Sequence, residues 1–124
     1  MDDKAELNRF AEMLVQLVRD TAISDCEARI PGFFGPPGPS EAWKKLSADR
    51  RTREAFREAI PDIVDQTLCR LLHALDHDDI PLAWQREDGS YISLYDLGRS
   101  EMSGWFATSD PDGWCPRYSK QRRR

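Results

Sequence analysis

Length, composition and cysteine content restrict what this chain can be. Its 124 residues suit one domain, and 40% hydrophobic with 32% charged residues are enough to build a core. No apolar run approaches the roughly 20 residues needed to span a bilayer, and the first residues lack the pattern of a signal peptide. Three widely spaced cysteines, Cys26, Cys69 and Cys115, do not form a disulfide framework. We expect a cytoplasmic single-domain protein with thiols, no metal and no cofactor.

The charge is unevenly distributed along the chain. Residues 117–124 contain five basic residues and no acidic one, and subtracting them from the net charge of −4 leaves −9 on residues 1–116. An acidic body repels nucleic-acid phosphates and attracts basic proteins. The sequence therefore argues against nucleic-acid binding and favours a protein partner with a basic surface. The basic end itself is expected to fray, so that truncation after Ser119 would change stability little.

The first predicted element is a long amphipathic helix from about Asp3 to about Cys26. Asp3 and Glu6 suit its first turn, because acidic side chains can cap the free N–H groups of a helix start. Apolar residues recur at steps of three and four and form one stripe. They are Leu7, Phe10, Ala11, Leu14, Leu17, Val18 and Ala22. Glu12, Gln16 and Arg19 are expected on a different, solvated face.

A segment rich in proline and glycine ends this helix. Residues 31–39 contain four prolines and three glycines, which cannot sustain a helical hydrogen-bond ladder. Ser40 can then cap a short helix, and a longer helix is predicted from near Ala48. Pro61 either opens a new helix or kinks a continuous one. The strongest apolar stripe follows, with Val64, Leu68, Leu71, Leu72 and Leu75. We expect this helix to pack against the first.

The pattern changes beyond residue 80. Residues 81–86 and 90–93 are typical of two short strands, and residues 87–89 supply turn chemistry between them. Short helical segments are predicted at 94–97, 99–108 and 116–121. The chain is therefore predicted to be a mainly helical α+β domain, with a helical part over 1–79 and a hairpin with an aromatic-rich lobe over 80–124.

Several short runs resemble small bacterial proteins of unassigned function. These runs are residues 60–66, 75–76, 80–84, 88–90, 94–98 and 104–105. The resemblance covers about residues 55–118. It implies a bacterial, cytosolic protein of one domain, and it implies no activity and no functional residue.

Cys69, His73 and His77 follow one another at steps of four, so they share one flank of a helix. Thiolate and imidazole are good ligands for transition metals, but a straight helix cannot place four ligands around one ion. We therefore expect a boundary cysteine and two solvated histidines. One alternative remains open, in which His73, Asp76 and His77 form the acid–base site of a small-molecule enzyme.

Aromatic residues concentrate towards the C-terminus, where residues 84–124 hold seven of the twelve. They either form a second small core or bind a partner, since Trp and Tyr dominate binding hot spots. The residues expected to contact a partner are Phe33, Phe34, Asp78, Asp79, Trp105 and Trp114. The sequence thus predicts a macromolecule-binding protein, of an inhibitor or immunity type or an accessory subunit, rather than an enzyme.

Overall fold

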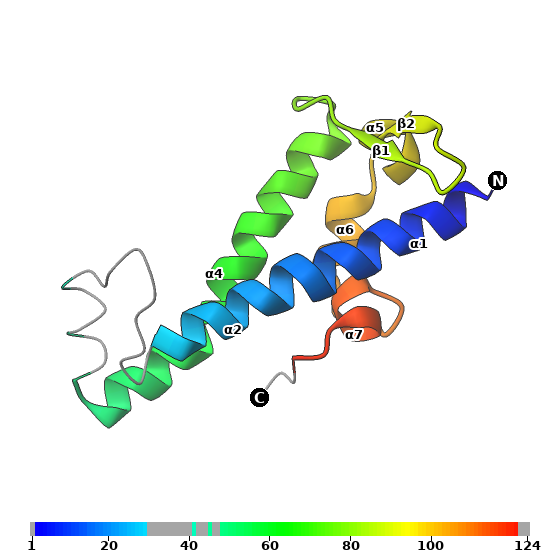
Figure 1. Cartoon of the computed structure of the whole chain (residues 1–124). Helices are drawn as coiled ribbons and strands as arrows, with labels where there is room; N and C mark the ends of the chain where they lie inside the picture. Colours follow the sequence, from blue (N-terminus) through cyan, green and yellow to red (C-terminus); the bar gives the residue numbers. More distant parts are fainter. Residues whose placement is uncertain (1, 30–40, 42–44, 46–47, 122–124) are drawn as a thin grey trace.

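Two long helical segments cross, and the short elements of the C-terminal half pack on one side of the crossing (Figure 1). The computed structural model describes residues 2–29, 41, 45 and 48–121. In chain order the elements are α1 (Asp3–Met13), η1 (Leu14–Arg19), α2 (Asp20–Arg29), α4 (Arg50–Asp76), β1 (Ala83–Gln85), β2 (Tyr91–Ser93), α5 (Leu94–Gly98), α6 (Met102–Ala107) and α7 (Trp114–Tyr118). The predicted mainly helical α+β class is confirmed. The proline- and glycine-rich loop and most of the short helix predicted after it lie outside the described residues.

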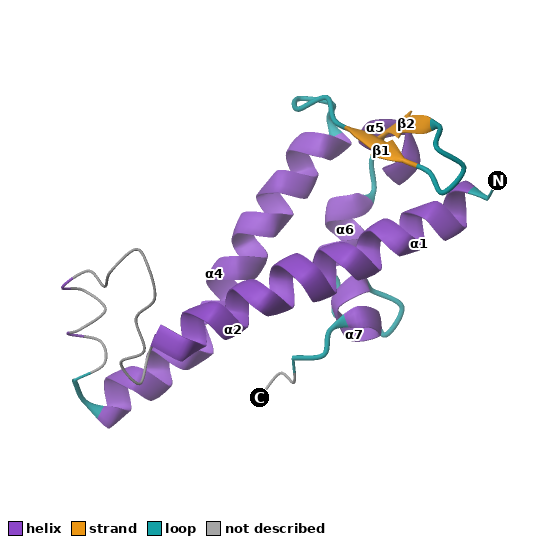
Figure 2. Ribbon diagram, in the orientation of Figure 1, coloured by secondary structure: helices purple, strands orange, loops and turns teal. Residues whose placement is uncertain are grey.

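Elements α1, η1 and α2 form one continuous rod, which we call the N-terminal rod (Figure 2). It begins at Asp3, as predicted, but the capping residue is Asp2, whose side chain accepts a hydrogen bond of 2.9 Å from the Lys4 N–H. It ends at Arg29 rather than near Cys26. The middle of the rod, η1, is a π-helix, in which each carbonyl bonds five residues ahead instead of four.

The π-helix changes which residues face the core. A π-turn takes in an additional residue, so the residues after it are rotated about the helix axis relative to an α-helix. Leu17 and Val18 are 63% and 47% exposed, although the apolar periodicity places them in the buried stripe. Val15 and Arg19 are buried in their place. The expectation for these residues is wrong because it assumed an unbroken α-helical period.

Helix α4 is continuous through Pro61, so the structure decides between the two readings of that proline. Asp49 caps the helix by accepting a hydrogen bond of 3.1 Å from the Thr52 N–H. The stripe beyond Pro61 is confirmed at Leu68, Leu72 and Leu75, whereas Leu71 lies exposed beside it. At 27 residues α4 is long, yet none of the helices in the described part of the chain is both long and apolar enough to cross a membrane.

The core joins both halves of the chain. Its main cluster contains Ala11, Leu14, Val15, Leu68, Leu72, Leu75, Leu94, Leu97, Met102, Phe106, Trp114 and Cys115. Phe10 links the halves directly, because its ring meets Trp84 and Trp114 edge-to-face at centroid distances of 5.3 and 6.1 Å. Trp84, Phe106, Trp114 and Tyr118 therefore extend the helical core, whereas Tyr91, Tyr95 and Trp105 are exposed. A smaller cluster of Ile23 and Ile60 lies where α2 meets α4.

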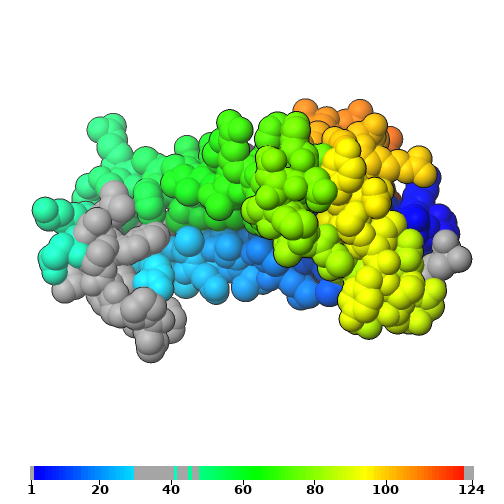
Figure 3. Space-filling view, turned by 90° about the horizontal axis from the view of Figure 1, so that it is seen from above, coloured from blue at the N-terminus to red at the C-terminus, as the bar shows by residue number. Residues whose placement is uncertain are grey.

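The hairpin is shorter than predicted and lies against the start of α1 (Figures 1 and 3). Its strands are antiparallel, with Trp84 paired to Ile92. Two arginines hold it in place. Arg9 Nη2 donates to the Gln85 carbonyl at 2.9 Å, and Arg86 Nε donates to Asp3 Oδ1 at 3.0 Å.

Candidate functional site

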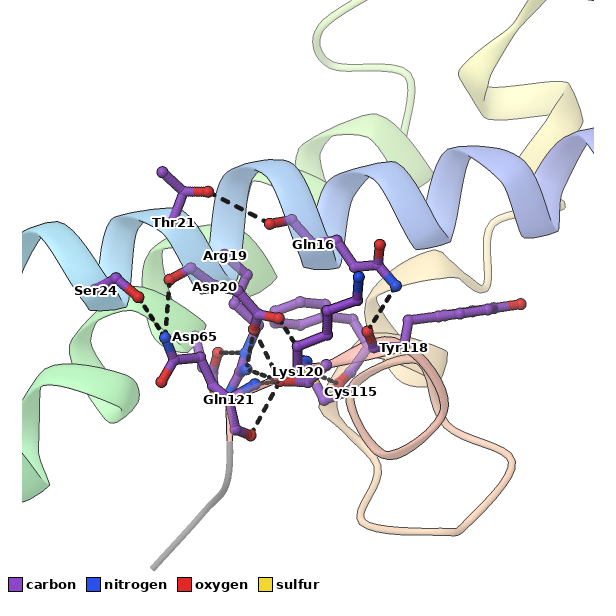
Figure 4. Close-up of polar contacts among 12 residues, drawn as sticks. Gln16, Arg19, Asp20, Thr21, Ser24, Asp65, Cys115, Tyr118, Lys120 and Gln121 are labelled. Atoms are coloured by element: carbon purple, nitrogen blue, oxygen red, sulfur yellow. Dashed lines mark hydrogen bonds and ion pairs between the residues drawn. The ribbon is translucent and has the colours of Figure 1, made fainter.

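Arg19 is the most deeply buried charged side chain in the described part of the chain, with 1% of its surface exposed. It ends the π-helix and points from the N-terminal rod towards α4 and the C-terminal segment (Figure 4). The expectation that Arg19 lies on the solvated face is wrong, because the additional residue in the π-turn rotates it inward.

Four hydrogen bonds hold the Arg19 guanidinium. Nε and Nη2 donate to the two carboxylate oxygens of Asp65 on α4, at 2.6 and 3.2 Å. Nη1 donates to Asp20 Oδ1 at 3.0 Å and to Ser119 Oγ at 3.0 Å. This group, which we call the Arg19 hub, therefore joins the rod, α4 and the C-terminal segment through one side chain.

The charges of the Arg19 hub do not cancel. Burial by itself lowers the pKa of Arg19, but hydrogen bonding to Asp65 and the charges of Cys115, Asp65 and Asp20 outweigh burial and raise this pKa above its ordinary value. Arg19 is thus a permanent cation beside two carboxylates, which leaves the hub with one surplus negative charge. Such a centre attracts cations and opposes phosphates and other anions.

Residues 119–121 of the C-terminal segment form hydrogen bonds to the N-terminal rod at this hub. The Ser119 hydroxyl donates to Asp20 Oδ1 at 2.8 Å, and the Lys120 N–H donates to Asp20 Oδ2 at 2.7 Å. The Gln121 side-chain amide donates to the Ser24 hydroxyl (Figure 4). The expectation of a frayed end is therefore wrong for Lys120 and Gln121, because both bond to the rod, and the rest of that end, residues 122–124, lies outside the described residues.

Two hollows flank the hub, separated by Phe106 and Ala107. The first has a volume of about 350 Å³, and its lining includes Arg19, Thr108, Cys115, Ser119 and Gln121 as well as Phe106, Ala107 and Pro116. The second, which we call the α4–α6 groove, also measures about 350 Å³ and is lined by Asp62, Asp65, Gln66, Cys69, Phe106 and Ala107. The groove combines acidic and amide groups with an apolar wall.

Asp76, from the alternative enzyme site, acts as a cap for α6. Its side chain is 2% exposed, and its two oxygens accept hydrogen bonds from the Met102 and Ser103 N–H groups at 3.0 and 2.8 Å. These two N–H groups belong to the first turn of α6, which has no partner for them within the helix. The Asp76 carboxylate is therefore engaged in holding α6 on α4.

The histidines of the alternative site lie exposed near the end of α4. The rings of His73 and His77 are in contact, with centroids 4.2 Å apart and their planes tilted by 42°, and His77 Nδ1 lies 2.8 Å from the His73 carbonyl oxygen. Cys69 lies one turn earlier and lines the α4–α6 groove. Among the described residues, no group of three or more histidine, cysteine or acidic side chains is arranged to hold a metal ion.

The residues expected to contact a partner are placed differently from one another. Asp78 and Asp79 are exposed just beyond α4, and Asp78 has a positive φ of 55°. Trp105 is 42% exposed on α6, whereas Trp114 is 3% exposed and packs on Phe10. The expected surface position of Trp114 is corrected, because α7 turns its ring into the core. Phe33 and Phe34 lie outside the described residues.

The Arg19 hub was not predicted from the sequence. Its elements, Arg19, Asp65 and Ser119, are separated by 46 and 54 positions, and the helical period assigned Arg19 to solvent. The one local signal is the charged pair Arg19-Asp20 in the mainly apolar segment 14–23. Because the site is a tertiary contact, local periodicity could not reveal it.

No family model, no curated protein and no solved structure matches this chain.

Proposed function

We propose that the protein is a binding module for a protein partner with a basic surface. The observation that carries this proposal is the α4–α6 groove, where Asp62, Asp65 and Gln66 face an apolar wall of Phe106 and Ala107. Interfaces commonly combine an apolar centre with polar groups that fix orientation. A basic side chain with an apolar stem matches both parts of this lining.

The charge around the groove supports a cationic partner over an anionic one. Asp62 is exposed, and its carboxylate forms no hydrogen bond or ion pair with any described residue. The Arg19 hub adds a surplus negative charge directly behind the groove, where low dielectric strengthens its effect. The acidic body of the protein, at −9 over residues 1–116, would increase the rate of encounter with a basic protein. The same field opposes nucleic acids.

An inhibitor, immunity-type or accessory role would use such a surface. Each of these roles needs a stable, preformed face and no chemistry of its own. The groove meets this requirement, because its walls are two helices that the buried Asp76 cap and the Arg19–Asp65 pair hold in place.

The alternative, a small-molecule enzyme using His73, Asp76 and His77, has weaker support. A general base needs a carboxylate or imidazole within reach of a substrate proton. The Asp76 oxygens instead accept two backbone N–H groups in the protein interior. The two histidine rings contact each other at the exposed surface, whereas the Asp76 carboxylate is buried.

The binding function is tested by capture from a lysate of the source cells with matched charge variants. Wild-type protein, Asp62→Lys and Asp112→Lys are immobilised, and bound proteins are compared at low and high salt. Asp112 provides the control because it is exposed on the turn before α7, away from the groove lining. We expect basic proteins on the wild type and on Asp112→Lys, with strong loss at high salt and on Asp62→Lys. Equal capture by all three proteins would contradict the proposal.

A further inference from the structure

We infer that the α4–α6 groove receives an arginine side chain of the partner; this inference rests on the proposed function and names the group that the groove recognises. The groove is defined by Asp62, Asp65, Gln66, Cys69, Phe106 and Ala107. Three properties of this lining, namely its charge, its volume and its mixture of flat apolar and polar groups, bear on the choice of occupant.

The groove and the Arg19 hub behind it carry a net negative charge, which favours binding of a cation. Arg19, Asp20 and Asp65 together carry −1, and Asp62, which has no ion-pair partner among the described residues, makes the total −2. Adding one guanidinium reduces this charge to −1 and gives Asp62 a partner. An anionic ligand would be repelled by this negative charge, so the groove favours cationic over anionic ligands before any contact forms.

The cation that already touches the groove lining cannot fill the groove itself. Arg19 reaches Asp65 from the interior, and its Nε, Nη1 and Nη2 atoms donate to Asp65, Asp20 and Ser119. Moving Arg19 towards Asp62 would break these bonds and leave the buried Asp20 carboxylate without its charge partner. The additional cation must therefore come from outside this hub.

The shape and chemistry of the lining favour arginine over lysine. A volume of about 350 Å³ lies at the small end for ligand pockets and suits a side chain rather than a large cofactor. Ala107 and the small exposed part of Phe106, which is 3% exposed, form the apolar part of the lining, and Asp62 and Gln66 add oxygen acceptors. A planar guanidinium can lie against an apolar or aromatic surface while its edge donates several hydrogen bonds, whereas an ammonium is a compact, strongly hydrated charge.

The probes that test this inference are short blocked peptides that differ in one side chain. Ac-Gly-Arg-Gly-NH2, its lysine analogue and its citrulline analogue are titrated into the full-length protein, and backbone amide signals are followed by NMR. Citrulline has nearly the shape of arginine without its charge. We expect the arginine peptide to shift the signals of Gln66, Cys69 and Ala107, with weaker binding of the lysine peptide and none of the citrulline peptide.

Matched variants locate the effect. Asp62→Asn should weaken binding of the arginine peptide about two- to fivefold, the range expected for one exposed ion pair. Asp112→Asn should leave it unchanged, because Asp112 lies outside the groove lining. Both variants are surface changes and should retain the fold, which the unchanged amide spectrum will show.

The outcomes separate this inference from the proposed function. Equal binding of the arginine and citrulline peptides, or signal changes outside the groove, would overturn the inference. Concentration-dependent self-association at the groove would also overturn it, because a second copy of this chain would then be the occupant. If capture of basic proteins is lost on Asp62→Lys but is equal on the wild type and Asp62→Asn, the inference fails while the binding function stands. If the peptide binds in the groove but no basic protein is captured, the arginine site stands and the proposed function fails.

Discussion

Two buried charged side chains, Arg19 and Asp76, are held by different kinds of partners. Asp76 accepts hydrogen bonds from two backbone N–H groups at the start of α6. Arg19 is held by the carboxylates of Asp20 and Asp65 and by the hydroxyl of Ser119. Asp76 thus fixes one short helix, whereas Arg19 ties together three segments that are far apart in the sequence.

The difference lies in how the charge is compensated. The Asp76 carboxylate meets neutral donors, and the partial positive charge of a helix N-terminus favours it there. Arg19 meets two full opposite charges in the interior, where removing one member of an ion pair leaves the others buried and uncompensated. Removing a side chain of the Arg19 hub should therefore lower the free energy of unfolding more, and disturb more segments, than removing the Asp76 cap.

The largest effect is expected for Arg19→Met. This change leaves Asp20 and Asp65 without their cation and should lower the free energy of unfolding by about 3–5 kcal/mol. Urea denaturation followed by circular dichroism measures the loss. The double variant Arg19→Met with Asp65→Leu should recover a large part of it, because the unpaired carboxylate is then also removed. A single variant as stable as the wild type would show that the hub is not structural.

The next effect is expected for Asp76→Ala. The change removes a helix cap and leaves two N–H groups unsatisfied, which should cost about 1–3 kcal/mol. Asp76→Asn keeps one acceptor oxygen and should cost less. Hydrogen exchange should accelerate at the Met102 and Ser103 amides while the amides of α2 remain protected. Acceleration throughout the molecule would contradict the local role that the comparison assigns to Asp76.

Truncation after Ser119 should destabilise the protein by about 1 kcal/mol, since it removes hydrogen bonds from Lys120 and Gln121 to Asp20 and Ser24. Truncation after Gln121 keeps these bonds and serves as the matched control. The midpoints of urea unfolding of the two truncated chains are compared at equal salt. If they are the same, the docked residues 120–121 add nothing to the Arg19 hub.

The exposed cap Asp49 should give a small pH dependence. Hydrogen bonds from the Thr52 hydroxyl and N–H lower the pKa of Asp49 below its ordinary value of about 3.9. Its stabilising contribution is therefore complete above that ordinary value and is lost as the pH falls through the lowered pKa. The experiment measures the melting temperature from pH 4 down to pH 2, and Asp49→Asn should make it depend less steeply on pH. An unchanged slope would contradict the role of Asp49 as a helix cap.

The smallest effect is expected for Leu17→Ala, within about 0.5 kcal/mol of the wild type, because the π-helix leaves this side chain in solvent. The matched change Leu14→Ala removes a core side chain and should cost about 2–5 kcal/mol. Thermal denaturation of both variants measures the contrast. Similar losses in the two variants would show that an α-helical phase continues through this segment.

The local pattern of the sequence was enough for the positions of most elements. The apolar steps of the first helix, the stripe after Pro61 and the turn chemistry around Gly89 predicted two long helices and a hairpin. All three depend on residues close together in the chain, so periodicity and turn preferences detect them. The acidic residues of the groove, Asp62 and Asp65, were not identified from the sequence, because it is their position beside α6 that distinguishes them.

The tertiary structure decided the rest. Leu17 turned outward and Arg19 inward because a π-turn shifted the helical phase, and Trp114 entered the core because α7 packs on Phe10. Asp65 and Ser119 became partners of Arg19 through contacts that span much of the chain. A buried charge is tolerated where distant groups neutralise it. Those groups come together only when the helices pack against each other. Composition and local periodicity therefore determined the helices and strands, whereas tertiary packing determined the site.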